Sequence, residues 1–384
     1  MSGVYLVTGA SGSVGSALVP VLLTQTEAQL YLLLRAGSAD ELAARMEALH
    51  AFWGHPPGDA LRRRITPLAG DVELDRFGLE AETYAELVGR CTHILHCAGK
   101  VRMNLPLQDA RSAAVASARQ VVGLARAAPR LEKVEFVSTV GVGGRMPGAV
   151  PETWIDTPRA FHNTYEQSKA EAEDLIRAEV ERGLPLTVHR PSMVVGEARG
   201  GRIIHFQIFY HLCEFLSGRR TRGLVPALGA ARLDIIPADY VARALAWASR
   251  TPETVGRILH LCSGPDAAMP LTELQRRVRA VWAAQGLDLP RLAPLPPRLL
   301  RAALPLLRAL TPAPARRALN ALPIFLDYLA DNQAFANTAT RRLLEPAGIV
   351  APDPRDYLDR LFDYYFRQAA AAPDRSAPAR RKRL

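Results

Sequence analysis

Cysteine, lysine and long apolar runs are scarce in this 384-residue sequence, and each scarcity excludes a class of protein. The four cysteines form no Cys-x-x-Cys pair and show no His/Cys spacing suited to zinc. A reduced, cytoplasmic protein without a structural metal is therefore expected. No apolar run is long enough to cross a bilayer, and the first residues lack the pattern of a signal peptide. We expect a chain that is not exported and has no transmembrane segment; peripheral membrane contact stays an alternative.

The basic residues are almost all arginine, because only four of the 48 are lysine, Lys169 among them. The formal net charge of +10 predicts attraction to anions such as nucleotide phosphates, phosphopantetheine, an acidic carrier protein or a membrane surface. A basic cluster at 380–383 closes a Pro/Ala-rich tail, 369–384, which we expect to be disordered. Since no nucleic-acid-binding module accompanies this cluster, nucleic acid is not expected as a partner.

The N-terminal half alternates short apolar runs with helical patterns, which is typical of βαβ units around a parallel sheet. The expected strands are Val4–Thr8, Leu30–Leu34, Ile65–Ala69, His93–His96, Val134–Ser138 and Leu186–Arg190. The expected helices open near Gly12 and at Ser38, with a capping box to Glu41, and span Leu107–Ala128 and Thr164–Arg182. Since each apolar run is short, the sheet should be buried on both faces. The predicted fold class is α/β, a Rossmann-type doubly wound parallel sheet.

After Arg190 the alternation loosens, and the pattern predicts a mainly helical C-terminal substrate lobe interleaved with the core. The expected elements are helices at His205–Ser217, Ala238–Arg250 and Tyr357–Phe366 and strands at Leu233–Ile236 and Ile258–Cys262. The predicted division is an NADP-binding core at 1–264, of which 197–233 contributes to the lobe, and a helical lobe or lid at 265–368. The Pro-, Leu- and Arg-rich stretch 289–323 predicts broken amphipathic helices, packed on the core or on a membrane surface.

A glycine-rich segment directly follows the first strand and opens the first helix. Glycines there permit a tight turn and let backbone amides approach a pyrophosphate at the positive end of the helix. The order of strand, turn and helix makes this pattern specific. It predicts a dinucleotide site formed by Thr8, Gly9, Ser11, Gly12, Ser13, Val14 and Gly15.

Later strand ends supply further cofactor contacts. At the end of the second strand, where an NAD-selective site carries Asp or Glu, the sequence has Arg35. A guanidinium suits a 2′-phosphate, which a carboxylate would repel, so NADP(H) is the predicted cofactor. After the third strand, Asp71 and Val72 are placed to meet adenine. After the fourth strand come three small residues that allow close approach of the cofactor: Cys97, Ala98 and Gly99.

Ser138 and Thr139 end the fifth strand, and Tyr165 and Lys169 follow on the next helix. A spacing of four puts Tyr165 and Lys169 on one helical face. An ammonium there would lower the pKa of the Tyr165 phenol and would reach the ribose hydroxyls of the nicotinamide half. Thr139 would donate a hydrogen bond to the substrate oxygen as negative charge builds during hydride transfer. The predicted catalytic residues are therefore Thr139, Tyr165 and Lys169, with Ser138 also at the cofactor.

Several motifs together point to a known family: Leu33–Ala36, Gly70–Val72, His96–Val101, Val137–Val142, Tyr165–Glu171, Arg190–Ser192, Val195–Glu197 and Ile236–Val241. Through them the chain resembles the extended short-chain dehydrogenase/reductases, most closely the branch of carrier-protein thioester reductases and fatty acyl reductases. The resemblance implies NADPH-dependent reduction of an acyl thioester, bound to a carrier protein or to coenzyme A, to an aldehyde or alcohol with Tyr165 as proton donor. It also implies cofactor contacts from Lys100, Pro191, Ser192 and Val194.

The sequence departs from the family pattern at one point. Where the family carries Asn-Val-x-Gly-Thr after the fourth strand, this chain has Ala114–Ala118. The asparagine supports the proton relay in the family, so either another group rebuilds the relay, turnover is slow, or the chain has a different role. Two alternatives follow, a reductase acting on a ketone, alcohol or nucleotide sugar, and a non-catalytic dinucleotide-binding protein. The retained Thr139, Tyr165 and Lys169 argue against the second.

Overall fold

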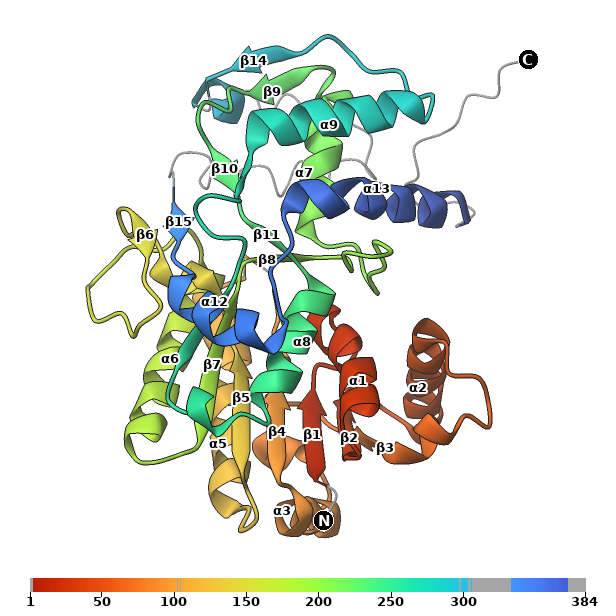
Figure 1. The fold of residues 1–384 in the computed structure, drawn as a ribbon, viewed down its shortest axis with the longest axis vertical. Coiled ribbons are helices and arrows are strands. Elements are labelled where there is room, and N and C mark those ends of the chain that lie inside the picture. The colour runs from red at the N-terminus through yellow and green to blue at the C-terminus, as the bar shows by residue number, and fades with distance from the viewer. Residues whose placement is uncertain are drawn as a thin grey trace.

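Seven parallel strands form the centre of the protein in a computed structural model that describes residues 3–101, 103, 105–296, 298–302, 305 and 333–371. Along the sheet the order is β12-β7-β5-β4-β1-β2-β3 (Figure 1). The strands are β1 (Val4–Thr8), β2 (Gln29–Leu34), β3 (Ile65–Ala69), β4 (His93–His96), β5 (Lys133–Val137), β7 (Leu186–Pro191) and β12 (Ile258–Leu261). Strand order reverses beside β1, so the ends of β1 and β4 flank the crevice in which such sheets bind ligands.

Helices cover both faces of this sheet. The helices on one face are α1 (Ser13–Gln25), α2 (Ala39–Trp53) and α8 (Ala238–Ala248), and those on the other are α3 (Ala81–Arg90), α5 (Ser117–Ala127) and α6 (Thr164–Glu181). Buried strands such as β1 are apolar along nearly their whole length, since both of their faces meet a helix layer. The predicted doubly wound α/β class is confirmed.

The predicted continuous helix at Leu107–Ala128 is wrong in its middle. The structure has α4 (Leu107–Arg111), a single π-helical turn η3 (Ser112–Ala116), and then α5. The Ser117 hydroxyl donates to the carbonyl oxygens of Ala113 and Ala114 at 2.8 and 3.0 Å. A side chain that bonds back to the preceding turn competes with regular helical bonding, and π turns are frequent at functional sites.

A strand predicted at Leu233–Ile236 is also interrupted. The structure has β10 (Arg232–Leu233) and β11 (Ile235–Pro237), which pair with different strands. Between them the buried Asp234 carboxylate accepts hydrogen bonds from the amides of Ser263 and Gly264 at 2.8 and 2.9 Å. These bonds turn the chain at Asp234, because the carboxylate must be satisfied inside the protein.

A second lobe, at the place in the chain where the substrate lobe was predicted, lies beyond the ends of the parallel strands (Figure 1). Its helices α7 (Ile208–Leu216), α9 (Leu271–Ala284) and α13 (Pro354–Ala371) share an apolar core around Trp282 and Phe362. Four two-stranded sheets complete the described fold, formed by β8 (Met193–Val195) with β11, β9 (Leu224–Pro226) with β14 (Ala293–Leu295), β10 with β13 (Met269–Pro270), and β6 (Ala149–Val150) with β15 (Ala334–Phe335).

The C-terminal part of the chain returns to the core. β15 pairs with β6, and α12 (Thr338–Leu344) lies beside the edge strand β12 (Figure 1). Strand β14 stands where the stretch 289–323 was predicted to be helical, and most of that stretch, from 306 on, lies outside the described residues. Of the predicted tail, 369–371 continues α13 and 372–384 lies outside the described residues. No described helix is both long and apolar enough to span a membrane.

Candidate active site

The glycine loop between β1 and α1 forms a close-packed cradle. Gly9 has φ +73°, and a Cβ atom on it would lie 2.6 Å from the Ala98 amide nitrogen. A Cβ atom on Gly15 would lie 2.2 Å from the Gly9 carbonyl oxygen. Gly12 is the N-cap of α1 and donates its amide to Gly9 at 2.9 Å. Only glycine fits at Gly9 and Gly15, and the tight turn that they allow leads into the N-terminus of α1, the end of a helix that favours an anion.

Side-chain hydrogen bonds join the end of β1 to the end of β4, next to the glycine loop. The Thr8 hydroxyl lies 2.8 Å from His96 Nδ1 and accepts a hydrogen bond from the Ala98 amide at 3.3 Å. Thr8 therefore holds the predicted Cys97–Gly99 segment against the glycine loop. Burial lowers the pKa of His96 to about 3, so this imidazole is neutral at physiological pH.

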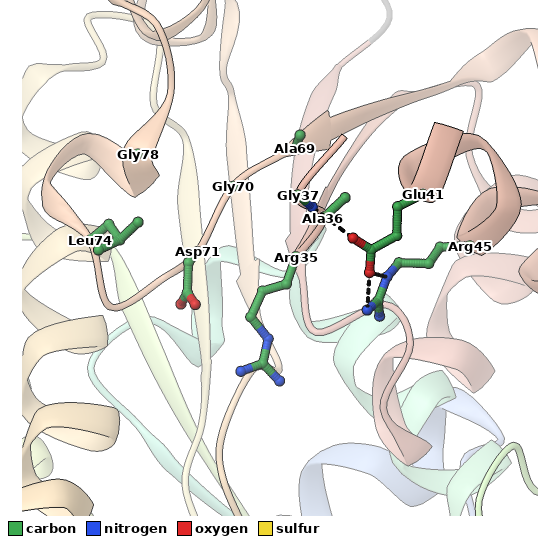
Figure 2. Close-up of a pocket in the computed structure, with 10 residues that line it drawn as sticks. All are labelled: Arg35, Ala36, Gly37, Glu41, Arg45, Ala69, Gly70, Asp71, Leu74 and Gly78. Carbon is green, nitrogen blue, oxygen red and sulfur yellow. Dashed lines mark hydrogen bonds and ion pairs between the residues drawn. The ribbon is translucent and has the colours of Figure 1, made fainter. Parts of the chain in front are cut away.

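A cavity of about 350 Å³ opens at the ends of β2 and β3 (Figure 2). Figure 2 shows the Arg35 side chain between Asp71 on one side and Glu41 with Arg45 on the other. The cavity thus brings together the predicted residues Arg35 and Asp71, and it adds Arg45, which sequence reasoning missed. The glycine cradle and this cavity fit a dinucleotide whose pyrophosphate lies at α1 and whose adenosine half lies over β2 and β3.

Arg45 is placed by the capping box that was predicted at the start of α2. Ser38 accepts the Glu41 amide at 3.1 Å, and the Glu41 carboxylate accepts the Gly37 amide at 2.8 Å. The same carboxylate accepts hydrogen bonds from Arg45 Nε at 3.0 Å and Nη2 at 2.7 Å. The i, i+4 spacing of Glu41 and Arg45 is the sequence signal that could have found the second arginine.

The loop after β3 carries unusual backbone angles. Arg76 and Phe77, neither of them glycine, have φ +48° and +60°. The Phe77 carbonyl accepts the Asp71 amide at 2.9 Å, so this turn sets the position of Asp71 beside the cavity. Lys100, predicted to meet the cofactor, instead forms an ion pair with Glu73 at 2.6 Å in this structure. That pair joins the loops after β3 and β4.

The predicted catalytic residues meet at the end of β5. The Asn163 side chain caps α6 by accepting the Glu166 amide at 3.0 Å, which starts the helix just before Tyr165. Thr139, which follows β5, lies close enough to the Tyr165 phenol to favour its ionised form, and its hydroxyl accepts the Gly141 amide at 3.1 Å. Lys169 is only 6% exposed, and its Nζ donates to the Val137 carbonyl at 3.1 Å. Gly99 borders the same ammonium, since a Cβ on Gly99 would lie 3.6 Å from Nζ.

The protonation of this pair differs from the expected lowering of the phenol pKa. Burial and the nearby Glu166 charge raise the pKa of Tyr165 to about 12, and the Thr139 hydroxyl opposes this rise only in part. Burial lowers the pKa of Lys169 to about 8, against the opposing charge of Glu173. At neutral pH the phenol is therefore protonated and most of the Lys169 ammonium is charged. Such a phenol can give up a proton but cannot act as a base.

The remaining predicted cofactor residues lie around the same edge. Ser138 is buried, and its amide donates to His189 at 2.7 Å. Ser192 is buried at the end of β7, while Val194 in β8 is half-buried. Among the described residues, no group of three or more His, Cys, Asp and Glu side chains is arranged to hold a metal ion.

Comparison with known proteins identifies the family. The profile of a family described as male sterility protein matches residues 7–245, more than half of the chain. The chain belongs to this family. Its core is accordingly an NAD(P)-binding domain of the extended short-chain dehydrogenase/reductase type, and the predicted thioester reductase branch is confirmed.

Related proteins are mostly large synthases. The isonitrile lipopeptide synthase of Streptomyces coeruleorubidus is 34% identical over 243 residues, which are 62% of this chain and 16% of that protein. A component of the linear gramicidin synthase of Brevibacillus parabrevis is 28% identical over 270 residues, 68% of this chain and 5% of that protein. This chain therefore corresponds to a small part of each.

Among solved structures, the terminal R domain of the myxalamid PKS-NRPS pathway is similar over almost its whole length. It is 26% identical with a TM-score of 0.80, and the match covers 98% of this chain and 93% of that one. The reductase domain of a nonribosomal peptide synthetase from Mycobacterium tuberculosis has a TM-score of 0.73 at 20% identity, over 95% of this chain and 91% of that chain. This second likeness shows the fold alone.

Ala114, where the resemblance to the short-chain dehydrogenase/reductases led us to expect an asparagine, lies at the π turn η3. Its side chain is buried and carries no polar group, and its carbonyl accepts from Ser117. Position 114 therefore offers no side-chain hydrogen-bonding group to the proton relay that the resemblance implied.

Proposed function

We propose that this chain is an NADPH-dependent reductase that releases an acyl group from a thioester, bound to a carrier protein or to coenzyme A, as an aldehyde or alcohol. The observation that carries the proposal is a protonated Tyr165 phenol next to Thr139, on the same helix as Lys169, whose ammonium borders Gly99. The family and the whole-length likeness to a terminal R domain support the same class of reaction.

Each residue of the site would have a separate role in the reaction. Bound NADPH would supply the hydride for the thioester carbonyl carbon. Thr139 would hold the carbonyl oxygen by a hydrogen bond, and Tyr165 would transfer its proton to that oxygen as negative charge builds there. Loss of the thiol from the resulting hemithioacetal breaks the C–S bond and leaves an aldehyde. A second reduction at the same residues would give the alcohol.

NADP(H) is favoured over NAD(H) by the charge at the adenosine end. Two guanidinium groups, Arg35 and Arg45, border the cavity, and a 2′-phosphate accepts charge-assisted hydrogen bonds from such groups. The one carboxylate on the α2 side, Glu41, already accepts bonds from Gly37 and Arg45. It is therefore not available to bind ribose hydroxyls as in an NAD-selective site.

The partner proposed is an acidic acyl carrier protein, because the chain carries a net charge of +10 and the related proteins named above are synthases. A cytoplasmic location is proposed as well. It is supported by four cysteines that are all free thiols, as expected in a reducing compartment.

The direct test is NADPH consumption with acyl-CoA and acyl-carrier-protein substrates of several chain lengths, with ketones and nucleotide sugars alongside. We expect oxidation of NADPH with thioesters, together with release of thiol. The Tyr165→Phe variant should lose about 100-fold or more in kcat with NADPH binding retained, since general acid catalysis supplies a factor of that order. Turnover of carbonyl compounds in place of thioesters would refute the substrate class. Binding of NADPH without turnover of any of these substrates would refute the proposal that the chain is an enzyme.

A further inference from the structure

A buried ion pair joins β7 to α6, the helix that carries Tyr165 and Lys169, and it has no part in the proposed reaction. Arg190, at the end of β7, and Glu173, on α6, have side chains only 1% and 5% exposed. Arg190 Nε donates to the two Glu173 oxygens at 3.0 and 3.2 Å, and Nη2 donates to Oε2 at 2.6 Å. Replacing a buried pair of this kind by apolar side chains is often neutral or stabilising, so stability alone gives little reason to keep it.

The Arg190 guanidinium also forms hydrogen bonds to groups other than Glu173. Arg190 Nη1 donates to the Thr153 carbonyl at 3.0 Å and to the Pro151 carbonyl at 3.3 Å. The same nitrogen lies 3.3 Å from His260 Nε2. His260 Nδ1 lies 2.7 Å from the Ala336 carbonyl, which requires a proton on Nδ1 and leaves Nε2 as the acceptor. Arg190 therefore has one fixed place, and it fixes Glu173 in turn.

Glu173 stands one helical turn beyond Lys169 on the same face of α6. The Lys169 ammonium donates a hydrogen bond to one neutral group, the Val137 carbonyl, and lies 5.6 Å from the centre of the Phe136 ring. The titratable and charged groups around it are Tyr165 and Glu173 on its own helix, the Arg190 guanidinium paired to Glu173, the Cys97 thiol, and the His96 imidazole on β4. Of these, His96 is neutral, and burial raises the pKa of Cys97 to about 12, so that thiol is uncharged as well. Glu173 is the one carboxylate in this set.

We propose that Glu173, locked by Arg190, is a positioning residue that keeps the Lys169 side chain charged and in place beside the cofactor cleft. The proposal rests on the proposed function, in which Lys169 serves the cofactor and Tyr165. A buried ammonium without an opposite charge would lose its proton near neutral pH or turn toward water. A carboxylate not held by Arg190 would be free to turn toward the Lys169 ammonium and to form a direct ion pair with it. The Arg190 fork prevents this by using both carboxylate oxygens.

The test measures the protonation of Lys169 directly, without substrate. The whole chain has four lysines, so protein labelled with ¹³C-lysine gives few Cε signals, and Lys169→Arg identifies the one of interest. In Glu173→Gln we expect the pKa of Lys169 to fall by about one unit or more, the usual effect of an opposite charge at this range. An unchanged pKa would overturn the proposal.

Glu179 provides the matched control. It lies on the same helix, about 15 Å from Lys169 along the axis at about 1.5 Å per residue. It is buried and forms ion pairs with Arg126 at 2.5 Å and Arg182 at 2.8 Å. Glu179→Gln should leave the Lys169 titration where it is in the parent protein. An equal fall in both variants would show a general loosening of α6 and would also overturn the proposal.

Removing one partner of a buried pair can prevent folding, so a second variant is needed. Glu173→Gln combined with Arg190→Met leaves no unpaired charge, and we expect a smaller fall in the pKa of Lys169 in the same direction. No fall in this double variant either would count against the positioning role. Thioester reduction is a separate measurement. Its absence would refute the proposed function and leave the Lys169 titration as informative as before.

Discussion

Two buried lysines lie near opposite ends of strand β5, and they differ in how many hydrogen-bond partners surround their ammonium groups. Lys133, at the start of the strand, is 4% exposed and donates to the carbonyls of Ala248 and Thr251 and to the Thr254 hydroxyl. It also pairs with Glu135 at 3.3 Å. Lys169, near the other end, makes one hydrogen bond among the described residues, to Val137. A buried ammonium with every donor used is structural, whereas one with spare donors beside a cleft is available to a ligand.

The largest expected effect is on activity, at Lys169. Lys169→Met should lower kcat/KM by about 100-fold or more, because the variant loses the ammonium that serves Tyr165 and the cofactor. Its thermal stability should hold or rise, since a desolvated charge is removed. Steady-state kinetics and calorimetry on the same preparation check both halves. Full activity in the Lys169→Met variant would show that Lys169 has no role in catalysis and does not differ from Lys133 in this respect.

The corresponding substitution at Lys133 should lower the stability of the folded protein and leave its activity unchanged. Lys133→Met leaves Glu135 and several acceptors without their donor, and breaking a buried pair costs about 3–5 kcal/mol. We expect a marked fall in the denaturant midpoint, with kcat/KM per folded molecule unchanged. Loss of activity without loss of stability would reverse the assignment of the two residues.

The same distinction applies to the two arginines at the cavity. Arg45 is bonded to Glu41, whereas Arg35 makes no hydrogen bond or ion pair within the described part of the chain. Arg35→Ala should therefore raise the KM for NADPH about 10-fold or more, in line with about 1.5–3 kcal/mol for a charged hydrogen bond. The KM for NADH should change little. Equal effects on both cofactors would show that Arg35 does not contact the 2′-phosphate.

The smallest effect is a pH dependence that Lys169 should produce. Its pKa in the folded protein, about 8, lies below the ordinary 10.5, so between these values the unfolded chain binds the proton that the folded one has lost. Stability from this group therefore rises with pH over that window, while activity should fall above about pH 8 as the ammonium is lost. A pH profile of kcat/KM, with unfolding measured in parallel, checks the opposite signs. A profile flat to about pH 10 would contradict the role of Lys169.

Local pattern was sufficient for much of the core. The strands, the glycine loop and Arg35 could be predicted because apolar periodicity and strand-to-helix order are properties of neighbouring residues. The Tyr165–Lys169 pair was predicted from helical spacing together with the glycine loop and the Ser138–Thr139 strand end. The helix predicted at Leu107–Ala128 is interrupted by a π turn at Ser112–Ala116, next to the Ser117 hydroxyl that bonds to the backbone, and alanine-rich spacing does not reveal such a turn.

The sequence by itself determined which groups are present and on which elements they stand. The tertiary structure alone decided what each meets: Thr139 beside Tyr165, Arg45 across the cavity from Asp71, and Arg190 locked between Glu173 and His260. It also decided that Tyr165 is harder, not easier, to ionise, because burial and the Glu166 charge together outweigh the opposing effect of Thr139. Desolvation and contact between distant segments depend on how the chain packs, and no spacing along it encodes them.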